Sequence, residues 1–183
     1  MEAAQYYKEY LAGDDDALAQ IIRLYKDGLI FYLNGYVRDI TVAEELTQET
    51  FVKLVIKRPK FSGNASFKTW LYTVGRNVAL DHMRRSKGTE VSIEDCPEAF
   101  DEEQELERIY LRQEDQILVH RSMGKLKQEY RQVLWLLYFE NFTNKEAARI
   151  LRKTTHNVEV LAYRARKALK TKLLEEGYVY EEL

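Results

Sequence analysis

The fold of this chain is decided by residues 61–87, which read FSGNASFKTWLYTVGRNVALDHMRRSK. The stretch opens with Ser62 to Ala65, whose residue types favour a loop, and Ser66 is suited to cap the helix that follows. Apolar residues recur from Phe67 to Val78 at helical spacing, which predicts a buried stripe. A second face of the same helix carries hydrogen-bonding residues and no apolar one: Thr73, Asn77, Asp81 and Arg84.

Positive charge gathers in this stretch, although the 183-residue chain has a formal net charge of −2. Residues 57–87 hold eight Lys and Arg and one Asp, a net charge of +7, together with four aromatic residues between Phe61 and Tyr72. Cationic grooves follow phosphates, and aromatic rings stack on unpaired bases at about 1–3 kcal/mol each. Two interpretations of this helix alone stay open: a nucleic-acid surface, or a solvated basic helix with ordinary core aromatics.

Composition narrows the class of protein. Hydrophobic residues make up 45% of the chain, only two Pro and eight Gly occur, and strand-like alternation is scarce, so we expect an all-α chain. No apolar run approaches the ~18 residues that span a bilayer, and the first four residues lack the features of a signal peptide. The lack of a long apolar run predicts no membrane insertion, and the lone Cys96, which has no partner for a disulfide, favours the cytoplasm.

Residues 1–87 are expected to form a bundle of four helices. Asp14 to Asp16 supply a cap for the second helix, Thr41 to Glu44 fits a capping box for the third, and Pro59 stops the third. The positions expected to face the core include Tyr7, Tyr10, Leu11, Leu29, Leu33, Leu46, Val52, Leu54 and Val55.

A change of composition marks residues 88–113 as a linker. Residues 90–115 hold eleven acidic and two basic residues, a net charge of −9, and include Pro97. This acidic linker is either a solubilising spacer or a strip that lies in a basic channel of a partner.

Residues 114–183 are expected to form a second helical domain. A helix from Gln128 to Phe139 is expected to carry Val133, Leu134, Leu137 and Tyr138 inward. Thr143 to Glu146 is a second capping box, a turn follows at Arg152, and Thr154 caps the last helix. A short helix, a tight turn and a longer basic helix describe a helix-turn-helix, and residues 145–172 carry nine basic and two acidic residues, a net charge of +7.

Catalytic and metal-binding patterns are not recognisable. His82, His120 and His156 lie in separate segments without metal-ligand spacing, and no glycine-rich phosphate loop occurs. We therefore expect no enzyme activity, no metal and no cofactor.

Four segments resemble the extracytoplasmic-function (ECF) group of sigma-70 family sigma factors of bacterial RNA polymerase. They are AEELTQETFVKL (43–54), FSGNASFKTWLYTVGRNVALDHMRR (61–85), EYRQVLWLLYFENFTNKEAARIL (129–151) and YRARKAL (163–169). The resemblance spans nearly the whole chain in the family's order. It implies two small helical domains, sigma region 2 at 1–87 and sigma region 4 at 114–183, joined by the acidic linker of 88–113.

The resemblance also implies roles for three sets of residues. The core-binding patch, which grips core RNA polymerase, is Glu45, Gln48 and Glu49. The minus-ten surface, which captures and reads melted promoter DNA, is Ser62, Gly63, Asn64, Ala65, Ser66, Phe67, Lys68, Arg76, Asn77, Asp81, Arg84 and Arg85. The recognition face, which reads the minus-thirty-five element in duplex DNA, is Lys153, Thr155, His156, Asn157, Glu159, Tyr163, Arg164 and Lys167.

The chain departs from the family's common pattern in the helix-turn-helix. Many members have Lys-Ser-Arg where this chain has Glu159-Val160-Leu161, and a Gly where Arg152 stands. A Glu repels phosphate and accepts from a cytosine amine instead, so the minus-thirty-five sequence is expected to differ.

The implied function is a sigma factor whose partners are core RNA polymerase and promoter DNA, both duplex and melted, with an anti-sigma factor as a candidate third partner. An autonomous helix-turn-helix regulator is the alternative, but it leaves the minus-ten surface and the core-binding patch without a purpose. The sigma interpretation requires accessible cationic surfaces, so it fails if both units form one core that hides them.

Overall fold

The computed structural model describes residues 2–87 and 114–178, so the linker of 88–113, Cys96 and the last five residues lie outside the described part. Every element of regular structure in these two ranges is helical, which confirms the all-α expectation. The N-terminal unit comprises α1 (Glu2–Leu11), α2 (Asp15–Val37), α3 (Ile40–Lys57) and α4 (Phe67–Lys87). The C-terminal unit comprises α6 (Glu114–Gly124), α7 (Gln128–Leu134), the π-helical turn η1 (Trp135–Phe139), α8 (Asn144–Leu151) and α9 (Thr155–Glu175).

Aspartate side chains cap the starts of α2 and α3. Asp14 accepts from the backbone N–H of Asp16 at 3.0 Å, as the acidic run predicts. The capping box expected at Thr41 to Glu44 is wrong, because Asp39 caps α3 two residues earlier by accepting from Val42 N–H at 3.1 Å. An aspartate is among the best N-cap residues, so the helix begins at the first position where one is available.

The buried face of α3 differs from the expected one. Val52 and Val55 are 48% and 42% exposed, so their assignment to the core is wrong, and so is that of Leu11 in α1 at 38%. Two threonines lie on the buried face instead. Thr47 and Thr50 donate to backbone carbonyls one turn earlier, each at 2.8 Å. Since these local hydrogen bonds satisfy the hydroxyls, both threonines can lie inside.

The C-terminal unit contains the expected helix-turn-helix. The capping box is confirmed, with reciprocal hydrogen bonds between Thr143 and Glu146, and Thr154 caps α9 by accepting from Asn157 N–H at 3.1 Å. The inward direction expected for Tyr138 is wrong, because this side chain is 50% exposed. In η1 the backbone hydrogen bonds join residues five apart, as from Glu140 N–H to the Trp135 carbonyl at 3.0 Å. The wider turn changes which side chains face the core, and Trp135 is buried instead.

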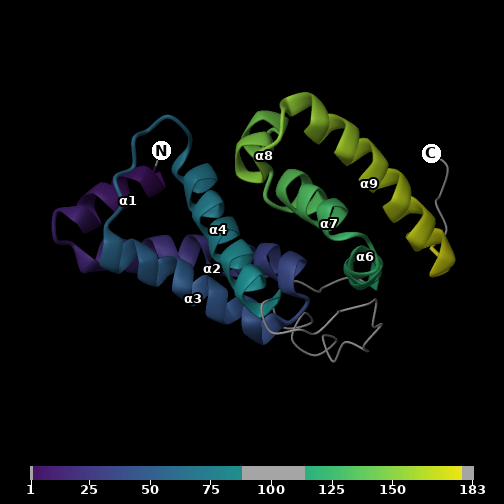
Figure 1. Cartoon of the computed structure of the whole chain (residues 1–183), viewed down its shortest axis with the longest axis horizontal. Coiled ribbons are helices and arrows are strands. Elements are labelled where there is room, and N and C mark those ends of the chain that lie inside the picture. The colour runs from purple at the N-terminus through teal and green to yellow at the C-terminus, as the bar shows by residue number, and fades with distance from the viewer. Residues whose placement is uncertain (1, 88–113, 179–183) are drawn as a thin grey trace.

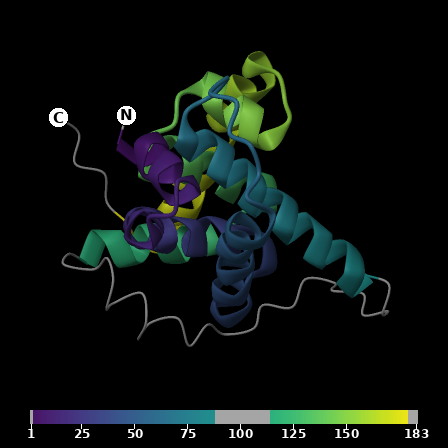
Figure 2. The ribbon, with the colours of Figure 1, turned by 90° about the vertical axis from the view of Figure 1, so that its left-hand side faces the viewer.

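The two units pack against each other, α4 against α8 and α2 against α7 (Figure 1). Figure 2 shows that the loop preceding α4 runs beside α8. Tyr72 of α4 meets Phe142 with ring centroids 5.1 Å apart, and Phe31 of α2 meets Trp135 at 5.3 Å. The buried residues of both units form one hydrophobic cluster. We call this contact the inter-unit interface.

Candidate nucleic-acid interface

The start of α4 is a capped loop end. The Ser66 hydroxyl accepts from the backbone N–H of Thr69 at 3.1 Å, which confirms it as the cap. Gly63 has a φ of +76°, a backbone conformation that favours glycine, and the loop around it is exposed. Phe67 is only 3% exposed and packs against Tyr7 with ring centroids 5.3 Å apart. Phe67 thus holds the end of the loop to the core of the N-terminal unit and does not expose its ring to solvent.

The polar stripe of α4 faces two directions. Arg84 forms an ion pair with Asp81, and Arg85 donates to the Asp81 backbone carbonyl at 3.3 Å. This end of α4 is directed to solvent. Arg76 and Asn77 lie on the same helix, one to two turns before Asp81 and Arg84, and are half-buried because they face the C-terminal unit. The minus-ten surface is therefore divided between an open end and a covered middle.

Side chains of α8 and its flanking turns cover that middle part. Arg152 donates to the Asn77 side-chain carbonyl at 3.3 Å, and Arg76 donates to the backbone carbonyl of Leu151 at 3.4 Å. Arg149 donates to the backbone carbonyl of Asn64 in the loop. These contacts join the loop and α4 to one end of the helix-turn-helix.

Two carboxylates complete the contact. Glu140 forms an ion pair with Lys68 at 2.8 Å, and its side chain is only 11% exposed. Glu146 accepts from the Ser66 and Thr69 hydroxyls at 3.2 and 3.3 Å. Burial raises the pKa of the Glu146 carboxyl, but hydrogen bonds from Thr143 and from the Ser66 and Thr69 hydroxyls outweigh burial and leave that pKa below its usual value.

The core-binding patch lies on the outer face of α3. Glu45 and Gln48 are exposed, whereas Glu49 is half-buried between Lys53 at 3.1 Å and Arg85 at 3.9 Å. Sequence reasoning missed the apolar residues that continue this face, Val52, Val55 and the 75% exposed Ile56. The two threonines at core spacing in α3 were the signal that these apolar residues lie outside.

The recognition face is open along α9. All eight of its residues are exposed, and Tyr163 reaches 63%. Lys153 lies beside Glu129 at 3.0 Å, a surface ion pair of small energetic weight. Among the described residues, none of the eight side chains makes a hydrogen bond or an ion pair with the N-terminal unit, so this surface can meet a major groove as the chain stands.

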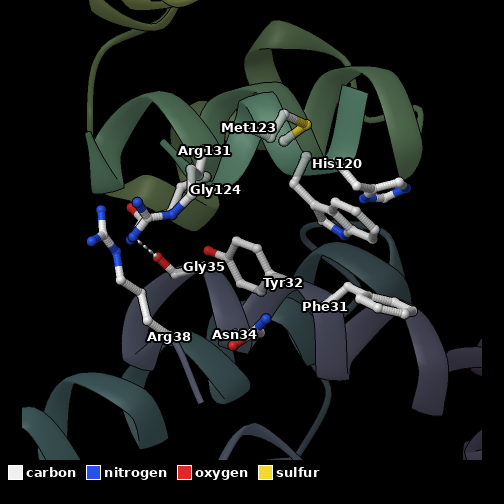
Figure 3. A pocket seen from close by; sticks show the side chains of 11 residues that line it. Phe31, Tyr32, Asn34, Gly35, Arg38, His120, Met123, Gly124 and Arg131 are labelled. Atoms are coloured by element: carbon white, nitrogen blue, oxygen red, sulfur yellow. Dashed lines mark hydrogen bonds between the residues drawn. The ribbon is translucent and has the colours of Figure 1, made fainter. Parts of the chain in front are cut away.

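A cavity of about 70 Å³ lies at the inter-unit interface between α2 and the pair α6 and α7 (Figure 3). On one side Arg131 donates to the Gly35 carbonyl at 3.0 Å. The side-chain N–H groups of Gln132 and Trp135 line the cavity, are buried, and find no acceptor among the described residues. The cavity is far smaller than ordinary ligand pockets, so we read it as imperfect packing.

Neither metal chemistry nor a membrane span can be assigned to the described residues. Across 2–87 and 114–178, no three His, Cys, Asp or Glu side chains are grouped so that they could hold a metal ion. In the same ranges no helix combines the length and apolarity that crossing a membrane requires.

Comparisons with known proteins agree with this arrangement. Residues 21–89 match the family model for sigma-70 region 2, and residues 116–169 match that for sigma-70 region 4. The chain is 32% identical over 170 residues to RNA polymerase sigma factor YlaC of Bacillus subtilis, covering 88% of this chain and 96% of YlaC. It is 29% identical over 167 residues to the RNA polymerase sigma-H factor of Pseudomonas aeruginosa, covering 86% of each.

Solved structures share the fold. CnrH, in complex with the cytosolic domain of CnrY, matches with a TM-score of 0.66 and 24% identity, covering 97% of each chain. RpoE of Bartonella quintana, in complex with the anti-sigma factor NepR, matches with a TM-score of 0.64 and 21% identity, covering 85% of this chain and 95% of RpoE. With both region models matched in order on an all-helical chain, this protein belongs to the ECF group of the sigma-70 family, the sigma factors that direct promoter-specific initiation of transcription by RNA polymerase.

Proposed function

We propose that three surfaces of this sigma factor divide its work. Residues 1–87 act as region 2, residues 88–113 as the linker and residues 114–183 as region 4, working in the cytoplasm. The core-binding patch of Glu45, Gln48 and Glu49 holds core polymerase, and the exposed Val52, Val55 and Ile56 extend it with apolar contact area. Apolar anchors surrounded by polar groups are the usual composition of a protein interface.

The minus-ten surface captures the melted non-template strand. Its loop from Ser62 to Ala65 stands beside the capped start of α4, and Asn77 and Asp81 follow on one helix face. Unstacking a base costs a few kcal/mol, which pocket contacts and stacking offset. Trapping bases that open transiently therefore melts the promoter without a chemical step.

The recognition face reads the minus-thirty-five element in the major groove. Its complete exposure along α9 is the observation that carries this part of the proposal. Asn157, Glu159 and Arg164 are residue types that hydrogen-bond base edges, while Lys153 and Lys167 suit phosphates. An anti-sigma partner also belongs to the proposal, because RpoE, which shares the fold, was solved with one.

Run-off transcription with core polymerase over a promoter library tests the assignment. Asn77→Ala with Asp81→Ala should slow open-complex formation about 5- to 150-fold, the range of one base contact, while core binding in pull-down stays unchanged. Gln48→Ala with Glu49→Ala should do the reverse and lose core binding first. Equal loss of both activities in the first variant, or unchanged core retention in the second, contradicts the division of surfaces.

A further inference from the structure

The covered middle of the minus-ten surface is occupied by groups of its own chain. Asn77 already accepts from Arg152, Ser66 already donates to Glu146, and Lys68 is already paired with Glu140. A hydrogen-bonding group with a partner in place must lose it before it can bind a base or a phosphate. In this state the C-terminal unit therefore competes with promoter DNA.

We propose that this arrangement is an autoinhibited state of the free sigma factor, in which α8 and its flanking turns act as an intramolecular ligand of the minus-ten surface and Arg152 is the latch. The inference rests on the proposed minus-ten role of Asn77. Opening moves α8 away and frees the surface, so melted DNA and the C-terminal unit are alternative occupants of one site.

Arg152 occupies a position where its own backbone does not favour it. It has a φ of +54° at the turn of the helix-turn-helix, a region in which glycine is free and a residue with a Cβ is strained. Its guanidinium contributes across the interface by donating to Asn77. Arg38 and Arg58 adopt the same left-handed conformation at the ends of α2 and α3, so it is the hydrogen bond to Asn77, and not the backbone, that marks Arg152 as part of the closed state.

The interface is also built to separate. Its cavity leaves the Gln132 and Trp135 donors buried without acceptors among the described residues, and opening returns both to water. Most of its polar contacts use charged side chains that water solvates well, among them Lys68 and Arg152. Closure is thus held by contacts that solvent or nucleic acid can replace.

Closure affects the three surfaces differently. The recognition face and most of the core-binding patch stay exposed, whereas Ser66 and the N-terminal half of α4 contact the C-terminal unit. The closed chain can accordingly meet duplex DNA and polymerase, and it reads single-stranded DNA only after it opens. This order keeps free sigma factor from binding unpaired nucleic acid.

The test measures opening through a thiol. Thr69 is 1% exposed and contacts Glu146 across the interface, so Thr69→Cys in a Cys96→Ser background reacts with a thiol reagent only when the chain opens. Arg152→Gly removes the latch and relieves the backbone, and it should speed the reaction about 2- to 10-fold, the range for one hydrogen bond. Adding Glu140→Gln, which removes the charge that pairs with Lys68, should speed it further.

Arg58→Gly is the matched control, because Arg58 also has a positive φ, +37°, and makes its contact with Tyr10 inside the N-terminal unit. It should leave the thiol rate unchanged. Equal rates in the parent and in both interface variants overturn the closed state. Urea unfolding of each variant separates opening from global loss of stability.

Run-off transcription with the same variants supplies the second readout. At limiting sigma factor, the Arg152→Gly chain should form open complexes faster by the factor seen in the thiol rate. Faster thiol reaction with unchanged open-complex formation overturns autoinhibition while the contact itself stands. Failure of every chain, the parent included, to transcribe any promoter instead refutes the proposed function.

Discussion

Gly28 provides a way to weaken the closed state without replacing any side chain assigned to DNA or polymerase. It lies inside α2, and a Cβ added there would come within 2.3 Å of a Glu140 carboxylate oxygen and 2.5 Å of the Tyr72 hydroxyl. Real Cβ atoms essentially never approach another atom so closely. Gly28→Ala should therefore push Glu140 from its place against α2 and from Lys68.

Two opposing free-energy terms set how far Gly28→Ala shifts the ratio of open to closed chain. Alanine stabilises a helix interior by about 1 kcal/mol relative to glycine, and this gain is shared by the open and the closed chain. Overpacking costs about 1–3 kcal/mol, and the Glu140 part of it exists only in the closed chain. Tyr72 is fully buried and packs against Phe142, so it has less room to shift while the units are in contact. The open-to-closed ratio should rise by at most about 5- to 150-fold, the limit that applies if the whole overpacking cost falls on the closed chain, since 1.4 kcal/mol corresponds to a factor of ten.

The same thiol reaction at position 69 measures this ratio, and small-angle scattering gives an independent check. A compact chain of this length has a radius of gyration of about 16 Å, and an open chain exceeds it. Gly35→Ala is the matched control, because it lies in the same helix at the same interface and the nearest atom to its added Cβ, in Gln132, is 4.0 Å away. Equal thiol rates for the two variants would show that Glu140 does not lie against Gly28 in solution, and the reasoning fails.

Two further predictions concern stability. Burial lowers the pKa of the His120 imidazole, which packs on Phe31 and Phe139, so the folded chain disfavours the charged imidazolium. The contribution of the neutral imidazole to folding stability is complete above a pH of about 6.5 and is lost as the pH falls toward the pKa of the folded chain. Urea unfolding should show the parent losing more stability between pH 7.5 and 5.5 than His120→Phe, and equal losses contradict this. Thr143→Ala removes the capping box of α8 and should lower the free energy of unfolding by about 1 kcal/mol, whereas Thr171→Ala, in an exposed stretch of α9, should change it by less than about 0.5 kcal/mol.

Local rules predicted much of the fold because their causes are local. Ser66, Thr143 and Thr154 cap helices as expected, since a hydroxyl placed before an apolar run reaches a backbone N–H within three residues. The exposed recognition face follows from the same logic. Charge repeated on one side of α9, opposite buried Val158 and Ala165, is a property of helical spacing.

The wrong predictions concern positions where two nearby residues could fill the same structural role, such as capping a helix or facing the core. Asp39 caps α3, where the sequence predicted Thr41 as the cap. Thr47 and Thr50 lie on the buried face of α3, where the apolar pattern predicted Val52 and Val55. In η1 a change of helical pitch redirected the side chains, and no residue type announces such a turn.

The inter-unit interface could not be predicted, because its contacts join residues that lie from 70 positions apart, as Tyr72 and Phe142 do, to 104 positions apart, as Phe31 and Trp135 do. Arg152 and Asn77, or Glu146 and Ser66, read in the sequence as separate polar residues of two modules. Only the packing of α8 against α4 gives them a common meaning. Sequence spacing predicts which face of a helix is polar, but it does not say whether water or another helix meets that face.

The sigma interpretation required that the cationic surfaces not be hidden in one core, and this condition is met in part. The two units do share one hydrophobic cluster, yet the contacts with the C-terminal unit are made by the N-terminal half of α4 and the loop before it, while α9 and the outer face of α3 stay open. Indiscriminate fusion would bury apolar and charged surfaces alike. Here the covered cations bind polar groups across the interface, as Lys68 does with the Glu140 carboxylate and Arg152 with the Asn77 side chain, so separation returns each of them to water. Selective cover of this kind distinguishes a surface held in reserve from a surface used as core.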